Sequence, residues 1–137
     1  MITTRILIAA IIGAILSLSA LAAGPEEQTY GSTRYLTGGV GQDEQQYMRE
    51  AAPRYPLAMT FTASTGQYLS DVKVTVKDRK GETVLSAVST GPMMLVNLAP
   101  GQYTVEAAFE GKTQTRKVAV AKGQHLRLAL RWNDVSG

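Results

Sequence analysis

The 137-residue chain contains no cysteine and one histidine, His125. Without cysteine it has no thiol nucleophile, no cysteine-ligated zinc and no iron–sulfur cluster. A single histidine rarely makes a metal site alone. Because His125 stands at the start of an expected strand, opposite in phase to Leu126, we expect an exposed side chain rather than a metal ligand. The sequence thus predicts no metal site and no cofactor.

Charge is sparse as well, with 14 Lys and Arg against 11 Asp and Glu and a formal net charge of +3. Nucleic-acid-binding proteins usually present a clustered basic face, so this small charge predicts no nucleic-acid partner. No serine has the flanking residues of a nucleophile elbow. The acidic pairs Glu26-Glu27 and Asp43-Glu44 lie in loop or helix-start contexts, which favours a solvated surface. We predict that the protein is not an enzyme and has no catalytic residues.

One long apolar run is present, at residues 6–18, preceded by Arg5 and followed by Ala20-Leu21-Ala22. The run is shorter than the roughly 20 apolar residues of a membrane-spanning helix. A positive start, an apolar core and a small-x-small exit are typical of a secretory signal peptide. We assign residues 1–22 to it, with cleavage after Ala22 or Ala23. A periplasmic or secreted protein with no stable membrane span is expected, and a disulfide-free exported domain suits a bacterial envelope.

Residues 23–56 form a polar, glycine-rich segment with weak periodicity. Thr37-Gly38-Gly39-Val40-Gly41 predicts a flexible loop. Residues 43–52 predict a short helix, with Asp43 and Glu44 near its positive end and Pro53 ending it. A narrow apolar stripe would dock this helix on the rest of the domain. The stripe consists of Met48, Ala51 and Ala52.

Residues 57–133 carry about seven alternating apolar and polar stretches separated by turns, which is typical of an all-β sandwich. Residues 93–98 are apolar on both faces, so this strand is expected to be central or covered, with the 43–52 helix as the candidate cover. The final strand is expected to point four side chains inward. These are Leu126, Leu128, Leu130 and Trp132.

Two stretches carry a family resemblance. Gly66-Gln67-Tyr68-Leu69-Ser70-Asp71-Val72 with the strand after it, and Leu98-Ala99-Pro100-Gly101-Gln102-Tyr103-Thr104-Val105, resemble the carboxypeptidase regulatory-like domain. The resemblance covers residues 57–132 and implies a seven-stranded prealbumin-like, Greek-key sandwich. With the preceding glycines and acidic helix, the chain is similar to small exported proteobacterial proteins. It departs from the family at Ser89-Thr90-Gly91-Pro92, where an Asp-Gly step is usual.

Tyrosines provide the remaining candidate site. Exposed aromatic rings often serve sugar-binding β modules, although tyrosine also packs with its ring buried and its hydroxyl wet. The candidate ligand surface consists of Tyr35, Tyr47, Tyr55 and Tyr68.

Together these features predict a non-catalytic, exported binding or assembly module of the bacterial cell envelope. Its partner would be an envelope protein or a glycan. One alternative is a carbohydrate-binding module that uses the exposed tyrosines. Another is an accessory subunit of a separate envelope enzyme or transporter.

Overall fold

The computed structural model describes residues 24–133, so the expected signal peptide lies outside the described residues. Within that range the chain forms nine strands, one α-helix and a 3-10 turn. In order these are β1 (Gln28–Tyr30), β2 (Thr33–Gly38), α2 (Gly41–Ala51), η3 (Ala52–Arg54), β3 (Leu57–Ala63), β4 (Lys73–Asp78), β5 (Thr83–Val88), β6 (Met93–Asn97), β7 (Gly101–Phe109), β8 (Lys112–Val120) and β9 (Leu126–Trp132). No helix between residues 24 and 133 has the length and apolar character needed to cross a membrane.

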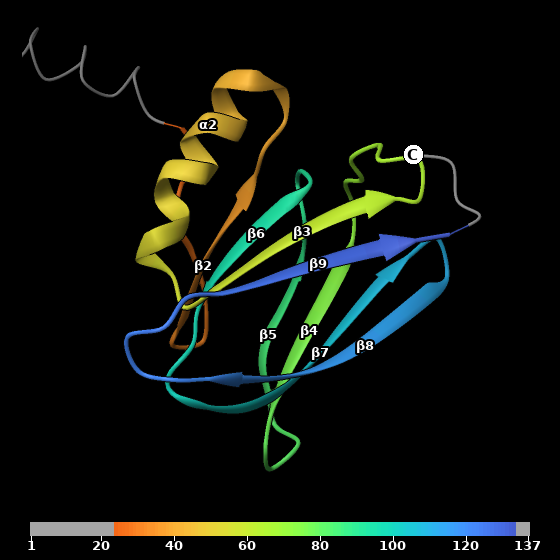
Figure 1. The fold of residues 1–137 in the computed structure, drawn as a ribbon. Coiled ribbons are helices and arrows are strands. Elements are labelled where there is room, and N and C mark those ends of the chain that lie inside the picture. Colours follow the sequence, from red (N-terminus) through yellow and green to blue (C-terminus); the bar gives the residue numbers. More distant parts are fainter. Residues whose placement is uncertain (1–23, 134–137) are drawn as a thin grey trace, which may run out of the picture.

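The strands form two sheets, with α2 lying against one of them (Figure 1). The five-stranded sheet has the order β1-β2-β6-β3-β9, and the four-stranded sheet has the order β5-β4-β7-β8. β3 and β9 run parallel, whereas the other pairs are antiparallel. The predicted all-β sandwich is confirmed, and the predicted strands after residue 56 correspond to the seven strands β3 to β9.

The core lies between the two sheets because each strand sends alternate side chains inward. Along β3, Leu57, Met59 and Phe61 are fully buried, and they belong to one cluster with Val74 and Val76 of β4. Each fully buried side chain of this size contributes about 1.5–3 kcal/mol. The alternation of apolar and polar residues in the local sequence therefore specifies both the strands and the faces that they bury.

Trp132 closes this core near the end of β9, as predicted. Its ring lies 6.3 Å from Phe61 and 6.1 Å from Phe109, in tilted arrangements. The indole Nε1 donates a hydrogen bond to the carbonyl oxygen of Lys112 at 2.9 Å. The buried aromatic ring thus also ties β9 to the beginning of β8.

The prediction for the other inward residues of β9 needs a correction. Leu130 is buried, but Leu126 and Leu128 are only half-buried, although they occupy the same phase of the strand. β9 is the last strand of its sheet, so no neighbouring strand covers its outer side. Position in the sheet, rather than phase, limits the burial of these two side chains.

The prediction of a flexible loop at residues 37–41 was wrong for most of this range, because only Gly39 and Val40 lie between β2 and α2. Thr37 and Gly38 belong to β2, where Gly38 pairs with Met93 of β6. A Cβ atom on Gly91 would lie 2.4 Å from the carbonyl oxygen of Gly38, so the two backbones meet where only glycine fits. Gly38 therefore marks close backbone packing, whereas Gly39 and Gly41 adopt positive φ values of 105° and 80°.

Hydrogen bonds fix the remainder of that segment. Glu44 Oε1 accepts the backbone N–H groups of Gly39 at 2.8 Å and Val40 at 3.2 Å, immediately before the helix. The Thr37 hydroxyl donates to the carbonyl oxygen of Met93 at 2.9 Å and accepts the N–H of Thr90 at 3.2 Å. The chain between β5 and β6, where the family resemblance departs, is thereby joined to β2.

Helix α2 begins at Gly41, two residues earlier than predicted, and its α-helical part ends at Ala51. The chain then continues through Pro53 in one 3-10 turn rather than stopping there. The predicted docking is confirmed, since Met48 and Ala51 are buried in a second cluster with Leu36 and Leu95. Leu95 is on β6, which confirms that this strand is covered on its second face.

Candidate functional site

Three of the four candidate tyrosines contact the chain's own residues 24–28. Tyr35 donates a hydrogen bond from its hydroxyl to Gln28 Oε1 at 3.1 Å. The Tyr55 hydroxyl donates to Glu27 Oε2. The Tyr47 ring lies so close to Gly24 that a Cβ atom there would come within 2.7 Å of it. These side chains hold the first described residues against the domain.

Tyr55 is the most enclosed of the three, with 7% of its surface exposed. Burial, followed by the hydrogen bond to Glu27 and the negative charge of that carboxylate, raises the pKa of Tyr55 to about 12. The other oxygen of Glu27 lies 4.0 Å from Arg34 Nη1. Tyr55 is therefore a packed anchor for this segment, and its ring is not an open platform.

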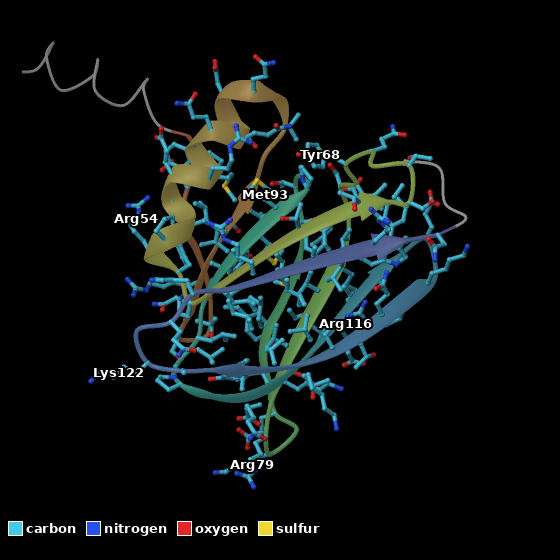
Figure 2. All side chains as sticks on the ribbon, viewed as in Figure 1. Arg54, Tyr68, Arg79, Met93, Arg116 and Lys122 are labelled. Atoms are coloured by element: carbon cyan, nitrogen blue, oxygen red, sulfur yellow. The ribbon has the colours of Figure 1, made fainter. Side chains whose placement is uncertain are left out.

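Tyr68 lies apart from the other three, in the connection between β3 and β4, and is 50% exposed. Figure 2 shows it far from Arg54, which directly precedes Tyr55. Of the other candidates, Tyr35 is half-buried and Tyr47 is 36% exposed. The structure brings Tyr35, Tyr47 and Tyr55 to the N-terminal segment and does not bring Tyr68 to them.

His125 lies just before β9, exposed to solvent, with its Nδ1 3.0 Å from the carbonyl oxygen of Tyr55. It borders a small hollow of about 120 Å³ together with Pro53 and Arg127. Across residues 24–133, no group of three or more His, Asp or Glu side chains is placed to hold a metal ion.

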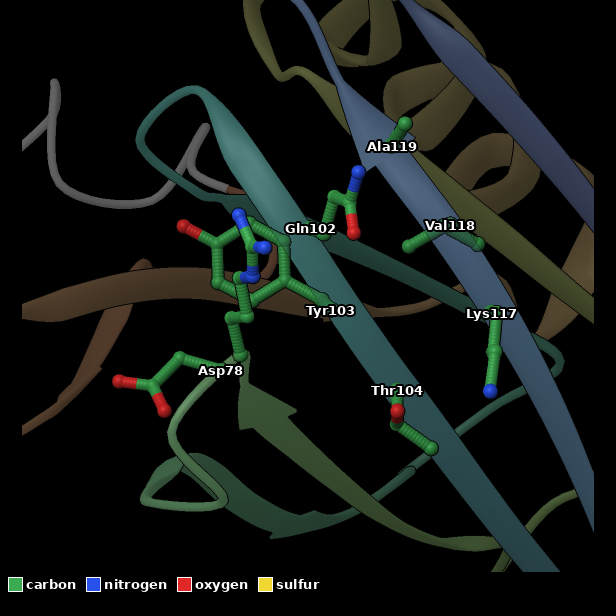
Figure 3. Close-up of a pocket in the computed structure, with 8 residues that line it drawn as sticks. Asp78, Gln102, Tyr103, Thr104, Lys117, Val118 and Ala119 are labelled. Atoms are coloured by element: carbon green, nitrogen blue, oxygen red, sulfur yellow. The ribbon is translucent and has the colours of Figure 1, made fainter.

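A larger hollow of about 330 Å³ opens beside the four-stranded sheet (Figure 3). It is bordered by Asp78 at the end of β4 and by Arg79 in the turn that follows. Gln102 and Tyr103 of β7 and Lys117 of β8 also border it. The Tyr103 hydroxyl donates to the carbonyl oxygen of Ala99 at 2.7 Å, and burial, with the nearby Asp78 carboxylate, raises the pKa of Tyr103. Tyr103 is in phase with the buried Val105 and Ala107 of β7, so the alternating pattern gives no sign that it borders a hollow.

The distribution of charge is a further feature that sequence reasoning missed. Residues 112–133 contain six Lys and Arg and no Asp or Glu, whereas residues 24–111 contain seven Lys and Arg and ten Asp and Glu. The small net charge of the whole chain hides this difference, because the acidic excess of the first region offsets part of the positive charge of the second. A scan of charge along the chain, rather than its total, reveals the difference.

Five exposed cations of this region lie on β8, on β9 and in the loop between them. We call them the basic edge: Arg116, Lys117, Lys122, Arg127 and Arg131. Figure 2 shows Arg116 on β8 and Lys122 at the far end of the loop. The ion pairs found between residues 24 and 133, Arg34–Glu27 at 4.0 Å and Lys77–Glu106 at 3.2 Å, involve none of these five. Within the described part of the chain, the basic edge therefore presents positive charges that form no ion pair.

β8 and β9 are each the last strand of their own sheet. Near the end of β9 they are joined by the Trp132 bond to Lys112 and by Gln114 Nε2, which donates to the carbonyl oxygen of Arg131. Arg116 Nη2 donates to Gln114 Oε1 at 2.9 Å, beside this junction. The basic edge thus surrounds two strand edges that meet at one end.

Comparison with known families places residues 60–131, more than half of the chain, in the Rhizobiales growth-associated tandem repeat domain. The chain belongs to this family. The repeat unit begins within β3 and ends within β9. β1, β2 and α2 precede the repeat unit. β2 pairs with one edge of β6, and α2 packs on the face of β6 that carries Leu95. No curated protein matches the chain.

Proposed function

We propose that the protein is a non-catalytic binding or assembly module of the bacterial cell envelope, exported by the signal peptide at residues 1–22, and that it contacts its partner through the basic edge. The observation that carries this proposal is the segregation of charge, with six cations and no acid in residues 112–133.

Physical reasoning supports a contact role for this region. Clustered charge of one sign raises association rates with an oppositely charged partner and disfavours partners of like charge. Exposed strand edges are also a common docking element, because their backbone groups can pair with an added strand. The partner would be an envelope protein. If that protein is an enzyme or a transporter, this module is its accessory subunit.

The proposal is tested by capture from envelope extracts at low salt with matched double variants. Arg116→Glu/Lys122→Glu reverses two positive charges of the basic edge. Arg49→Glu/Arg54→Glu makes the same change in net charge on α2 and η3. We expect one envelope component to be retained by the wild type and by the second variant, and to be lost from the first. Equal retention by both variants would rule out the basic edge as the contact.

We also propose that the sandwich is prealbumin-like with Greek-key connections, as the resemblance to the carboxypeptidase regulatory-like domain implies. Support comes from the seven strands β3 to β9 and from the Pro100-Gly101 step, which introduces β7. Superposition of an experimental structure on prealbumin-like sandwiches tests this. A different strand order would refute it.

Carbohydrate binding is a second candidate, favoured by the hollow beside Tyr103. A half-buried ring, the amide of Gln102 and the charged groups of Asp78 and Lys117 line its 330 Å³, and sugar sites commonly combine an apolar ring with a few polar groups. A glycan array is the test. Binding that is lost in Gln102→Ala but kept in Tyr68→Ala would assign the glycan to this hollow, and the opposite result would assign it to the surface around Tyr68.

A further inference from the structure

The free edge of β9 has the features of an incomplete sheet. Leu126 and Leu128 point toward the core cluster but remain half-buried, whereas Leu130, in the same phase, is 1% exposed. Leu130 lies next to the junction with β8, and the other two lie further from it. A strand placed beside β9 would put side chains next to both leucines and cover them.

The backbone of β9 has groups that point away from β3. The N–H of Leu126 donates to the carbonyl oxygen of Pro56 at 2.8 Å, on the β3 side. Because successive residues of a strand direct their backbone groups to opposite sides, Arg127 and Ala129 direct theirs to the free side. The Arg131 carbonyl oxygen, in the same phase, accepts a bond from Gln114 of β8, which supports this assignment.

The outward side chains of β9 determine which strand suits this edge. Arg127 and Arg131 are exposed on the outer face, with the small Ala129 between them. Like charges directly opposite one another destabilise a strand pair, and opposite charges stabilise it. A second β9 paired about Ala129 would place Arg127 opposite Arg131, and in any register it would add two more arginines to this edge. This edge therefore disfavours its own copy and favours acidic side chains.

We propose that an extended segment of a partner protein, with alternating acidic and apolar residues, adds to β9 as a sixth strand of the five-stranded sheet. Its acidic side chains face Arg127 and Arg131, and its apolar side chains cover Leu126 and Leu128. Its backbone pairs with Arg127 and Ala129. The junction at Arg131 confines the added strand to the stretch from Leu126 to Leu130. This inference rests on the proposed function and names the class of partner for the basic edge.

The first test uses synthetic peptides as probes. The probe is a seven-residue peptide of alternating Glu and Val with capped termini. One control has the same composition with all Glu before all Val, and the other alternates Lys and Val. Binding is measured by fluorescence anisotropy at low salt. We expect the alternating acidic peptide to bind about tenfold more tightly than either control. Equal binding of the alternating and block peptides would show that charge alone attracts them, and would overturn strand addition.

Variants of the full chain separate the edge from its surroundings. Arg127→Glu should weaken binding of the acidic peptide about tenfold, whereas Lys122→Glu, with the same charge change in the loop, should have a much smaller effect. Ala129→Pro removes an N–H that the pairing with β3 does not use, so it should leave the fold intact and abolish binding. Circular dichroism checks the fold of each variant. Equal weakening by Arg127→Glu and Lys122→Glu would overturn the inference.

Hydrogen exchange gives a readout specific to strand addition. With the acidic peptide bound, the amides of Arg127 and Ala129 should exchange more slowly, and the amide of Leu126, already bonded to Pro56, should change little. Unchanged exchange at Arg127 and Ala129 would refute the proposal. Slower exchange with rising protein concentration and no peptide would assign the edge to a second copy.

Capture from envelope extracts separates failure of strand addition from failure of the proposed function. If Ala129→Pro still retains the envelope component that is lost in Arg116→Glu/Lys122→Glu, the basic edge remains the contact and strand addition to β9 is wrong. If neither variant affects retention, both the contact and the strand addition fail.

Discussion

At the scale of single residues, the tyrosines acquire a role that the sequence does not reveal. Tyr35, Tyr47 and Tyr55 contact residues 24–28, the first part of the chain that the structure describes. The hydroxyls of Tyr35 and Tyr55 and the ring of Tyr47 are therefore engaged by the protein itself. A tyrosine-rich segment can thus indicate an anchored terminus as well as a ligand platform.

The raised pKa of Tyr55 predicts a loss of stability at high pH. Its pKa is about 12 in the folded protein against an ordinary 10.0, so the folded state retains this proton more strongly than the unfolded state. The resulting stabilisation is complete below about pH 10 and declines as the pH rises toward about 12. Denaturation with urea across this range should show the decline.

Tyr55→Phe is the matched control for this effect, because it keeps the ring and removes the ionisable hydroxyl. The decline in the free energy of unfolding between about pH 10 and 12 should be smaller in the variant than in the wild type. Titration of phenolate absorbance should also lose its latest-ionising component. An identical pH profile for the two proteins would contradict the assignment.

At the scale of elements, the strands after residue 56 followed from alternation, because their inner and outer faces differ in every second residue. β2 was missed because its last residues, Thr37 and Gly38, are buried without being strongly apolar. Their burial comes from pairing with β6 and from the close approach of Gly91. Local hydrophobicity carries no record of such a contact.

Two leucines of β9 point to the same face of the strand but lie at different distances from its junction with β8, so their substitution separates the effect of phase from the effect of position. Leu130→Ala should lower the free energy of unfolding by about 2–5 kcal/mol, because it leaves a cavity in the closed core. Leu128→Ala, the same change two residues earlier, should cost about 1–2 kcal/mol, because the side chain is only half removed from water. Urea denaturation of both variants measures the difference. An equal loss of unfolding free energy in both variants would mean that Leu128 is as well covered as Leu130.

At the scale of the whole molecule, charge is separated between two regions. Residues 24–111 have an excess of three acids, and residues 112–133 have six cations and no acid. These cations lie on β8, on β9 and in the loop between them, and β8 and β9 are edge strands of the two sheets. The charge segregation in the sequence therefore places positive charge along one edge of the sandwich. The small net charge of the chain therefore does not describe the local charge that a partner would contact at this edge.

This separation predicts different chromatographic behaviour for variants of equal net charge. Arg127→Gln/Arg131→Gln should elute from a cation exchanger at clearly lower salt than the wild type, since the resin contacts the most basic side of the molecule. Arg49→Gln/Arg54→Gln should elute close to the wild type. Identical elution of the two variants would show that total charge, not its distribution, governs binding.

The sequence by itself determined the absence of thiol chemistry, the seven strands from β3 to β9, and a helix that docks through Met48 and Ala51. These depend on composition and on the local period of apolar residues, which neighbouring positions encode. Only the tertiary structure decided that three tyrosines hold residues 24–28, that Leu126 and Leu128 lie at an open edge, and that five cations lie on or between two edge strands. Each of these depends on which distant segments meet, and no local pattern contains that information.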